Sequence, residues 1–209
     1  MRFSSPALVL LAAALALGAC ADPNAPRGPA ESTLRTGYEA WRADRDSTMR
    51  GDASPLPSRD PAGLRYYAFD ADYAVAIELQ PNPVPDTVRL ATSTGVPKPF
   101  TRYATAAFTL GGERQRLTVF RPVGPGSAYL FVPFSDPTNG RETYGAGRYV
   151  EVEETSGTAV VLDFNRAYNP YCAYNARYVC PLPPDENRLS VPVAAGERLP
   201  TPEAAAGGV

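Results

Sequence analysis

Hydrophobic and polar side chains alternate along much of the chain after residue 63. Residues 73–80 place tyrosine, valine, isoleucine and leucine at every second position, which is typical of a half-buried strand. Residues 88–90 and the continuous apolar run 129–134 predict two further strands. Proline or glycine follows each run, so these strands are expected to be short and separated by turns.

Two segments of this pattern predict hairpins. Apolar residues on both sides of Gly111-Gly112 predict a hairpin over residues 108–119. Segments 149–153 and 158–164 flank Thr155-Ser156-Gly157, and we expect them to pair with each other. A last strand is predicted over residues 189–193.

The register of the second hairpin depends on the length of its turn. A two-residue turn places Arg148 opposite Asp163, whereas a three-residue turn places Tyr149 there. A slip of one residue exchanges the two faces of a strand, so the sequence leaves both registers open. In either register, the loop that ends at Arg148 and the loop that begins at Asn165 leave from the same end of the sheet.

The pattern before residue 63 has a helical period. Leu34, Tyr38, Trp41 and Arg45 recur at helical spacing and predict a helix over residues 32–49. Ser32 is the expected N-cap, and the only tryptophan is expected to pack the helix on the core. The charged residues expected on its solvated face are Asp44, Arg45, Asp46 and Arg50.

These elements predict a mainly β fold. Seven or eight short antiparallel strands are typical of a β-sandwich or a barrel-like domain. We expect one such domain over residues 32–199, with a single N-terminal helix laid against it.

Residues 1–19 have the pattern of an export signal. Arg2 precedes an apolar run that is too short to span a membrane comfortably. Leu17-Gly18-Ala19-Cys20 resembles the lipobox of bacterial lipoproteins, in which the cysteine becomes acylated. The alternative is an ordinary signal peptide in which Cys20 is incidental. Several acyl chains would hold the protein stably on a membrane. Ala21 after the cysteine resembles lipoproteins exported to the outer membrane, which gives an envelope location facing the periplasm. Residues 20–31 are then a flexible tether, and residues 200–209 a disordered tail.

Composition limits the kinds of catalytic, metal and binding site that the chain can form. The chain has no histidine, which excludes a Ser-His-Asp triad, a Cys-His pair and a histidine-based zinc site. Its formal charge is −2, and it becomes −3 when the leader with Arg2 is removed, so nothing favours binding to nucleic acid. We expect neither a metal nor a cofactor. Hydrophobic residues make up 44%, enough for a packed core, and the 23 prolines favour short elements.

Candidate binding residues gather in two loops. The glycine-containing loop 135–148 can turn tightly or approach a ligand, although Asp136 there can equally cap a turn. The second loop follows the predicted strand 158–164, on which Asp163 and Asn165 share a face. A cross-strand Arg148–Asp163 pair of merely structural value is the competing interpretation. The residues predicted to surround a common cleft are Asp136, Glu142, Tyr144, Arg148, Asp163, Asn165, Tyr168 and Asn169.

Cysteine and tyrosine cluster in the second loop. Cys172 and Cys180 are expected to form a disulfide in an oxidising compartment. A metal pair would lack histidine and a third thiol, and a catalytic thiol would lack a base. Four tyrosines either cover one end of the β-domain with their hydroxyl groups bonded to backbone, or stack on a sugar or another flat ligand. They are Tyr168, Tyr171, Tyr174 and Tyr178.

Three long motifs resemble one protein family. They are F-x-D-P-T-N-G-x-E-T-Y-G-A-G-R-Y, L-D-F-N-R-A-Y-N-P-Y-C-A-Y-N and C-P-L-P-P-D-E-N-R-L. They resemble a bacterial family catalogued only as a domain of unknown function, family 1684, over roughly Leu34 to Leu199. This resemblance implies no activity, substrate or catalytic residue.

The sequence therefore favours a lipid-anchored envelope protein that binds a small ligand or an envelope partner through its loops. The first alternative is a hydrolase that uses carboxylates, with Asp136, Glu142 or Asp163 as acid or base and Arg148 holding an anion. The second alternative is a purely structural envelope factor.

Overall fold

The computed structural model describes residues 28–124 and 129–202. Its long helix, α1 (Glu31–Arg50), confirms the helix expected from the sequence. Ala30 precedes the helix and provides no side-chain cap, so the expectation that Ser32 is the N-cap is wrong. Arg45 is also not on the solvated face, because it lies on the buried side of α1 with Tyr38 and Met49.

Most strands belong to one antiparallel sheet. It has the order β2-β4-β5-β6-β7, with β3 also paired to β4. Its strands are β2 (Gln80–Pro81), β3 (Thr87–Leu90), β4 (Lys98–Leu110), β5 (Glu113–Pro122), β6 (Tyr129–Phe134) and β7 (Arg148–Glu153). A second sheet consists of β1 (Ala74–Glu78) and β8 (Ala159–Asp163). The sheets do not close into a barrel, so the sandwich-like alternative is confirmed.

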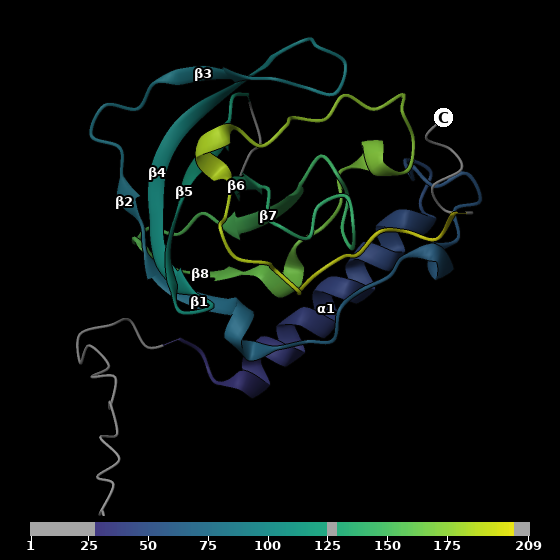
Figure 1. The fold of residues 1–209 in the computed structure, drawn as a ribbon, viewed down its shortest axis with the longest axis horizontal. Coiled ribbons are helices and arrows are strands. Elements are labelled where there is room, and N and C mark those ends of the chain that lie inside the picture. Colours follow the sequence, from purple (N-terminus) through teal and green to yellow (C-terminus); the bar gives the residue numbers. More distant parts are fainter. Residues whose placement is uncertain (1–27, 125–128, 203–209) are drawn as a thin grey trace, which may run out of the picture.

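Figure 1 shows how these layers are arranged. The large sheet curves through the left and centre of the view, with β1 and β8 beneath it and α1 crossing diagonally below the strands. In the described residues, five short 3-10 helices lie in the connections between these elements. They are η1 (Pro61–Gly63), η2 (Ala71–Tyr73), η3 (Phe164–Arg166), η4 (Tyr171–Ala173) and η5 (Asp185–Asn187).

The hairpin expected around Gly111-Gly112 is confirmed. It joins β4 to β5, with Leu110 paired to Glu113 across the turn. Both glycines have positive φ angles, of 58° and 80°, which is why this turn uses glycine.

The hairpin expected between segments 149–153 and 158–164 is wrong. β7 pairs with β6, which places Phe134 opposite Arg148, and β8 pairs with β1, which places Ala74 opposite Asp163. Neither register considered for Asp163 is therefore correct. The loop between β6 and β7 folds on itself, since the Thr138 carbonyl accepts from three successive backbone N–H groups of residues 141–143. This long loop can therefore act as the hairpin connection.

The strand expected over residues 189–193 is also absent from the structure. The alternation itself is correct, because Leu189, Val191 and Val193 are all buried in the main core. Side chains replace the ladder of a neighbouring strand, because Gln115 accepts from the Ser190 N–H and Asp136 accepts from the Val193 N–H. The segment is thus held like a strand without forming one.

The large sheet buries hydrophobic side chains on both faces. In β6, Leu130, Val132 and Phe134 enter the main core with strands β1, β4, β5, β7 and β8. Phe131 points to the opposite face, where it packs with Phe100 and Tyr149 in a second cluster. Successive residues of a strand face opposite sides, so this second cluster needs a cover of its own. Residues of α1 and of the 168–181 segment lie over it.

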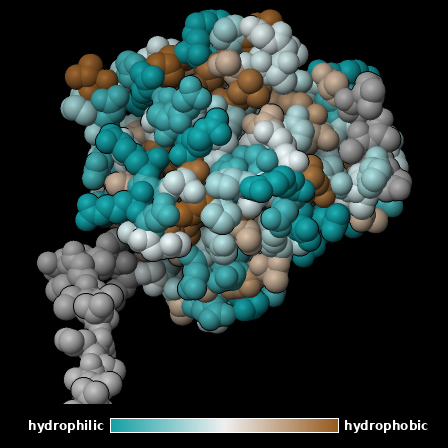
Figure 2. All heavy atoms as spheres, viewed as in Figure 1, coloured by the Kyte–Doolittle hydropathy of each residue, from teal (hydrophilic) through white to brown (hydrophobic). Residues whose placement is uncertain are grey.

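The surface seen in Figure 2 is mostly hydrophilic. Hydrophobic residues appear there in small separate groups rather than in one large patch. The large hydrophobic side chains most exposed in the described residues are Val84, Val96 and Val123, all in connecting segments.

Candidate functional site

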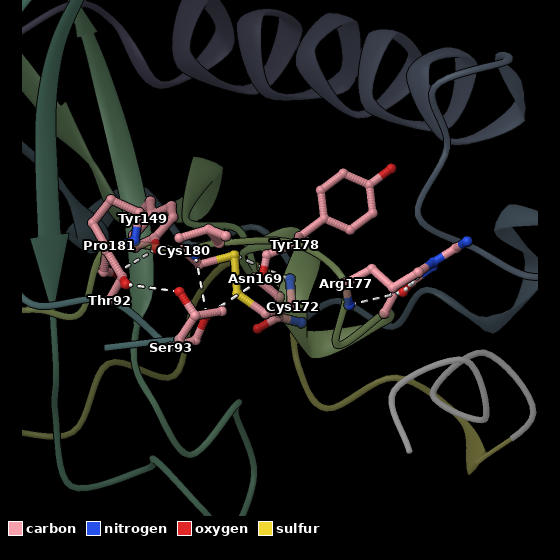
Figure 3. Close-up of a disulfide and its surroundings, with 12 residues drawn as sticks. Thr92, Ser93, Tyr149, Asn169, Cys172, Arg177, Tyr178, Cys180 and Pro181 are labelled. Atoms are coloured by element: carbon pink, nitrogen blue, oxygen red, sulfur yellow. Dashed lines mark hydrogen bonds between the residues drawn. A yellow bond between two sulfur atoms is a disulfide. The ribbon is translucent and has the colours of Figure 1, made fainter. Parts of the chain in front are cut away.

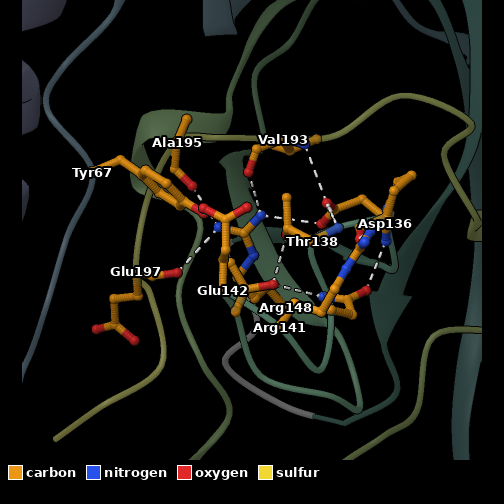
Figure 4. A network of polar contacts seen from close by, with 12 residues as sticks. Tyr67, Asp136, Thr138, Arg141, Glu142, Arg148, Val193, Ala195 and Glu197 are labelled. Atoms are coloured by element: carbon orange, nitrogen blue, oxygen red, sulfur yellow. Dashed lines mark hydrogen bonds and ion pairs between the residues drawn. The ribbon is translucent and has the colours of Figure 1, made fainter.

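Arg148, at the start of β7, is completely buried and pairs with Asp136 from the preceding loop. Its Nη2 atom donates to Asp136 Oδ2 at 3.1 Å and to the Val193 carbonyl at 2.8 Å. Its Nη1 atom donates to the carbonyls of Ala195 and Glu197, as Figure 4 shows. Burial lowers the pKa of Arg148, and the Asp136 carboxylate acts in the opposite direction. Arg148 therefore fastens the C-terminal segment to the sheet, rather than facing a cleft.

Asp136 is held as firmly as its partner. Its Oδ1 atom accepts from the Thr138 N–H at 2.8 Å and from the Val193 N–H at 3.1 Å. The first of these bonds confirms the interpretation of Asp136 as the cap of a turn. The expected cross-strand pair of Arg148 with Asp163 is wrong, because Asp136 takes that place.

Glu142 and Tyr144 lie further along the same loop. The exposed Glu142 accepts a hydrogen bond from the Tyr67 hydroxyl at 3.0 Å, and its backbone carbonyl accepts from the Leu199 N–H. Tyr144 packs against the cluster around Met49 and Tyr174, where burial raises its pKa. Tyr144 thus connects the loop to the helix, and Glu142 connects it to the C-terminal segment.

Asp163 and Asn165 form a separate buried unit at the end of β8. Asp163 caps η3 through the Asn165 N–H at 3.0 Å and pairs with Arg166 at 3.4 Å. The Asn165 amide exchanges two hydrogen bonds with the backbone of Asp70. Burial raises the pKa of Asp163, while its bonds from Asn165 and the charge of Arg166 lower it. Asn165 therefore acts as a substitute peptide group that attaches η2 to η3.

Asn169 belongs to a third unit, whose centre is the fully buried Glu197. The Glu197 carboxylate accepts from Arg45 at 2.8 Å, from the Asn169 N–H at 2.7 Å and from the Tyr174 hydroxyl at 2.8 Å. The Tyr66 hydroxyl adds a longer bond of 3.3 Å. Burial is the largest single influence and lowers the pKa of Arg45, but Glu197 together with Tyr174 and Tyr168 raises it above its ordinary value.

Sequence reasoning missed both central residues of this third unit. Arg45 follows Tyr38 by seven positions, or about two helical turns, so the spacing indicated the buried face of the helix. We expected it on the solvated face because its side chain is charged. Glu197 ends the apolar run V-P-V-A-A-G, and this context was the available signal that the carboxylate is buried.

The eight candidate residues therefore do not converge on one open cleft in the described structure. Asp136 lies with Arg148 and Asp163 with Asn165, while Asn169 lies beside Glu197. Tyr168 alone of the eight lines the cleft described next. Their role in ligand binding stays a prediction.

A cleft of about 500 Å³ lies between α1, the second face of the large sheet and the 168–181 segment. We call it the tyrosine cleft. The sheet contributes Tyr149, whose hydroxyl donates to the Pro181 carbonyl, and Glu151, which accepts from the Tyr168 hydroxyl. The aromatic residues that line it are Trp41, Phe100, Tyr129, Phe131, Tyr149, Tyr168, Tyr171 and Tyr178. Its charged lining residues are Asp44, Arg45, Lys98 and Glu151.

The disulfide expected between Cys172 and Cys180 is confirmed, and Cys180 belongs to the wall of the tyrosine cleft. Its Cα atoms are 6.2 Å apart. Cys180 exchanges hydrogen bonds with Ser93, as Figure 3 shows, and the Lys98 ammonium donates to the Val179 carbonyl at 2.8 Å. The crosslinked loop is therefore attached to the segments that flank β3 and β4.

The four tyrosines of this segment have different roles. Tyr174 is fully buried on Glu197, and the Tyr178 hydroxyl donates to the Ala53 carbonyl at 3.1 Å. Tyr168 and Tyr171 lie beneath Arg45, whose guanidinium carbon is 4.9 Å and 5.7 Å from their ring centroids. Covering the β-domain and lining a cleft are thus functions of the same segment.

Among the described residues, no helix has the length and apolar character needed to cross a membrane.

Comparison with known protein families identifies a match for most of the described chain. Residues 60–198 match the model of a family described as protein of unknown function, DUF1684. The chain belongs to the DUF1684 family. The resemblance seen in the three motifs is thus confirmed, although the match begins at residue 60 rather than near Leu34.

A solved structure similar to this DUF1684 protein is an uncharacterized protein of Haloarcula marismortui, determined by NMR in solution. It is 38% identical, has a TM-score of 0.66, and the alignment covers 80% of this chain and 95% of that one. A search among curated proteins finds no match. These relatives supply a fold and a family, and the function has to be argued from the site.

Proposed function

We propose that this DUF1684 protein binds a small ligand in the tyrosine cleft while anchored to the cell envelope through Cys20. The observation that carries the proposal is the cleft itself. Its volume of about 500 Å³ falls within the range of roughly 300–1,000 Å³ that is usual for small-molecule sites. Aromatic side chains from three distant segments converge there, and such rings offer flat faces to a ligand.

The two loops that carry the eight candidate residues are not needed as the ligand site for this proposal. The polar groups of Arg148, Asp136 and Asn165 form hydrogen bonds within the protein, which supports a structural role for them. The cleft borders that framework, because Tyr168 follows η3 and Tyr149 follows Arg148. A rigid framework that presents loops and aromatic rings is the usual setting of a binding site.

The carboxylate hydrolase is less well supported. That reading calls for a carboxylate with a raised pKa beside an ionised one in an open cleft. Burial raises the pKa of Asp163, but its carboxylate is engaged with Asn165 and Arg166 rather than with a second acid. Ligand binding without chemistry is therefore the function that the geometry favours.

Blocking the cleft tests the binding proposal. Thr48 is exposed on α1 and lines the cleft, so Thr48→Trp should fill it. Ser47→Trp is the matched control, since Ser47 is equally exposed on α1 but does not line the cleft. A library of sugars, neutral aromatic compounds and amines would be screened by two-dimensional NMR. We expect hits whose shift changes map to cleft residues and vanish in Thr48→Trp alone. Absence of any hit, or hits that survive the block, contradicts the proposal.

The location is tested separately at the lipobox. Cys20 lies outside the described residues, so the support for an anchor comes from the sequence. Cys20→Ser should release the protein from outer-membrane fractions or block its maturation. Unchanged fractionation, with no lipid on the mature N-terminus, would contradict anchoring without affecting the binding proposal.

A further inference from the structure

Both positively charged side chains of the tyrosine cleft donate to acceptors of the protein itself, and Arg45 is paired with a buried carboxylate. Arg45 donates to Glu197 through Nε at 2.8 Å, and its Nη2 donates to the Asn169 carbonyl at 3.0 Å. Lys98 donates to the Val179 carbonyl at 2.8 Å. A guanidinium that holds a buried carboxylate cannot release it to bind an external anion without leaving that carboxylate unpaired.

The negative charges of the cleft are not committed in this way. Asp44 is exposed on α1 and has no hydrogen bond or ion pair within residues 28–124 and 129–202. Glu151 accepts only the Tyr168 hydroxyl on Oε1, which leaves Oε2 without a partner in the same residues. These two carboxylates therefore offer negative charge to a ligand of the cleft.

The exposed Glu151 side chain shares its face of the sheet with aromatic residues of the cleft. Phe131 is its direct neighbour across β6 and β7, and the Phe131 ring lies 4.7 Å from that of Tyr149. Tyr129 is close enough for Glu151, together with burial, to raise its pKa, and its hydroxyl has no partner in the described chain. A carboxylate among ring faces is the combination that attracts organic cations, because ring faces carry partial negative charge.

The cleft wall already contains one such contact. The Arg45 guanidinium lies over the Tyr168 ring at 4.9 Å, so the protein places its own cation on one of these rings. Cation–π contacts are worth about 0.5–2 kcal/mol, and a nearby carboxylate adds Coulomb attraction.

From this arrangement we infer that the ligand of the tyrosine cleft is an organic cation, an amine or quaternary ammonium compound, whose charged group lies between Glu151 and the surrounding rings. The inference rests on the proposed function and adds the chemical class of the ligand. Neutral sugars also stack on tyrosine, but they would leave both carboxylates without a counter-charge. Anions would meet those carboxylates directly.

An isosteric pair of probes separates charge from shape. Choline carries a quaternary ammonium group, and 3,3-dimethylbutan-1-ol has the same shape without the charge. Trp41 is the only tryptophan of the chain and lines the cleft, so its fluorescence reports binding in the full chain. We expect saturable choline binding that is at least tenfold tighter than that of the alcohol. In Thr48→Trp, whose cleft is blocked, NMR should detect no choline binding.

Two substitutions on β7 provide the variant and its control. Glu151→Gln keeps an acceptor for Tyr168 and removes the charge, and it should weaken choline binding at least tenfold while leaving the alcohol unchanged. Glu153→Gln removes the same charge two residues along, from an exposed position that does not line the cleft, and should have little effect.

The outcomes distinguish this inference from the proposal on which it rests. Equal affinity for choline and the alcohol, or equal effects of the two substitutions, overturns the cation inference. Absence of choline binding overturns it as well. If methyl glucoside or a neutral aromatic compound then binds in a way that Thr48→Trp abolishes, the cleft is still a ligand site and only the class is wrong. If nothing in the library binds, both fail.

Discussion

The Arg45 guanidinium donates to the Glu197 carboxylate at 2.8 Å across 152 positions of sequence. One residue lies on the first helix and the other in the last described segment, and their side chains are only 9% and 0% exposed. This ion pair therefore joins both ends of the described chain beneath the tyrosine cleft.

Removal of one partner of this pair should destabilise the fold strongly. Glu197→Ala leaves Arg45 with an uncompensated charge in a buried site, which costs about 3–5 kcal/mol in other proteins. Urea unfolding should show a loss of that size in the free energy of unfolding. The control is Asp52→Ala at the Arg59–Asp52 pair, whose side chains are 55% and 100% exposed. An exposed pair contributes about 0–1 kcal/mol, so similar losses in both variants would contradict the prediction.

The elements that the sequence predicted well are those fixed by local pattern. The helix over 31–50, the Gly111-Gly112 hairpin and the strand 129–134 each follow from spacing and turn residues over a few positions. The disulfide could also be predicted, because Cys172 and Cys180 are the two cysteines other than the lipobox Cys20. In each case the deciding interactions lie close together in the sequence.

The sequence failed where distant segments compete for the same partner. β7 was predicted to pair with segment 158–164, whereas its pairing with β6 depends on a loop that satisfies its own backbone around Thr138. Arg148 was placed opposite Asp163 because the correct partner, Asp136, belongs to that loop. Charged residues also mislead when their partners are remote, and Glu197 was passed over for this reason.

Asp163 should make stability depend on pH. Its pKa is raised from an ordinary value of 3.8, chiefly by burial. The folded protein therefore holds this proton more tightly than the unfolded chain. The stabilising contribution is complete below about pH 3.8 and is lost as the pH rises through the higher folded value. Asp163→Asn has no such proton, so its stability relative to the natural protein should increase with pH across this range.

Urea unfolding from pH 3 to pH 7 would measure this difference. Asp60→Asn is the matched control, because Asp60 is an exposed residue that caps η1 through the Ala62 N–H. Other titrating groups contribute equally to each variant and cancel in the comparison. A difference for Asp163→Asn that varies with pH no more than the control does would show that burial of this carboxyl has no energetic consequence.

Asn187 should contribute strongly to the stability of the fold. Its buried amide accepts from the Thr118 N–H at 2.7 Å and donates to the carbonyls of Thr118 and Pro133. Asn187→Asp replaces the donating NH₂ group by an acceptor that faces those two carbonyls. Buried acceptors without donors cost about 1–3 kcal/mol each.

A loss of at least about 2 kcal/mol in unfolding free energy is therefore expected for Asn187→Asp. Asn175→Asp is the matched control, because the Asn175 side chain acts as an acceptor for Arg177 in the hydrogen bonds that the structure shows. An equal effect of both variants would mean that the Asn187 donors are dispensable.

Reduction of the disulfide should loosen the tyrosine cleft. The bond closes a short loop, and a loop of this length contributes about 2–3 kcal/mol in the chain-entropy model. Replacement of Cys172 and Cys180 by serine should lower stability by that amount and weaken ligand binding followed by Trp41 fluorescence. Reductant should act similarly on the natural protein and should leave the double variant unchanged. Unaltered binding after verified reduction would show that the wall is rigid without its crosslink.

Gly196 should be the least replaceable glycine near Glu197. Its φ angle is 77°, a region that other residues enter only with strain. A Cβ atom there would lie 2.4 Å from the Ala167 carbonyl oxygen, so the absence of a side chain allows the Glu197 N–H to reach that carbonyl at 2.8 Å. Gly95 offers a matched comparison, with a φ angle of 79° and nothing within 4 Å of an added Cβ.

The two alanine substitutions therefore separate backbone strain from a steric clash. Gly95→Ala should cost only about 1 kcal/mol, the penalty of the left-handed conformation. Gly196→Ala should cost several times more, because the segment must move away from η3 and withdraw Glu197 from Arg45. Urea unfolding measures both losses. The Tyr66 and Tyr174 hydroxyl groups, which donate to Glu197, supply a local readout, since their NMR signals should shift in Gly196→Ala and stay in place in Gly95→Ala. Equal losses for the two variants would mean that the C-terminal segment can retreat freely, and that the Arg45–Glu197 pair does not depend on the close approach at Gly196.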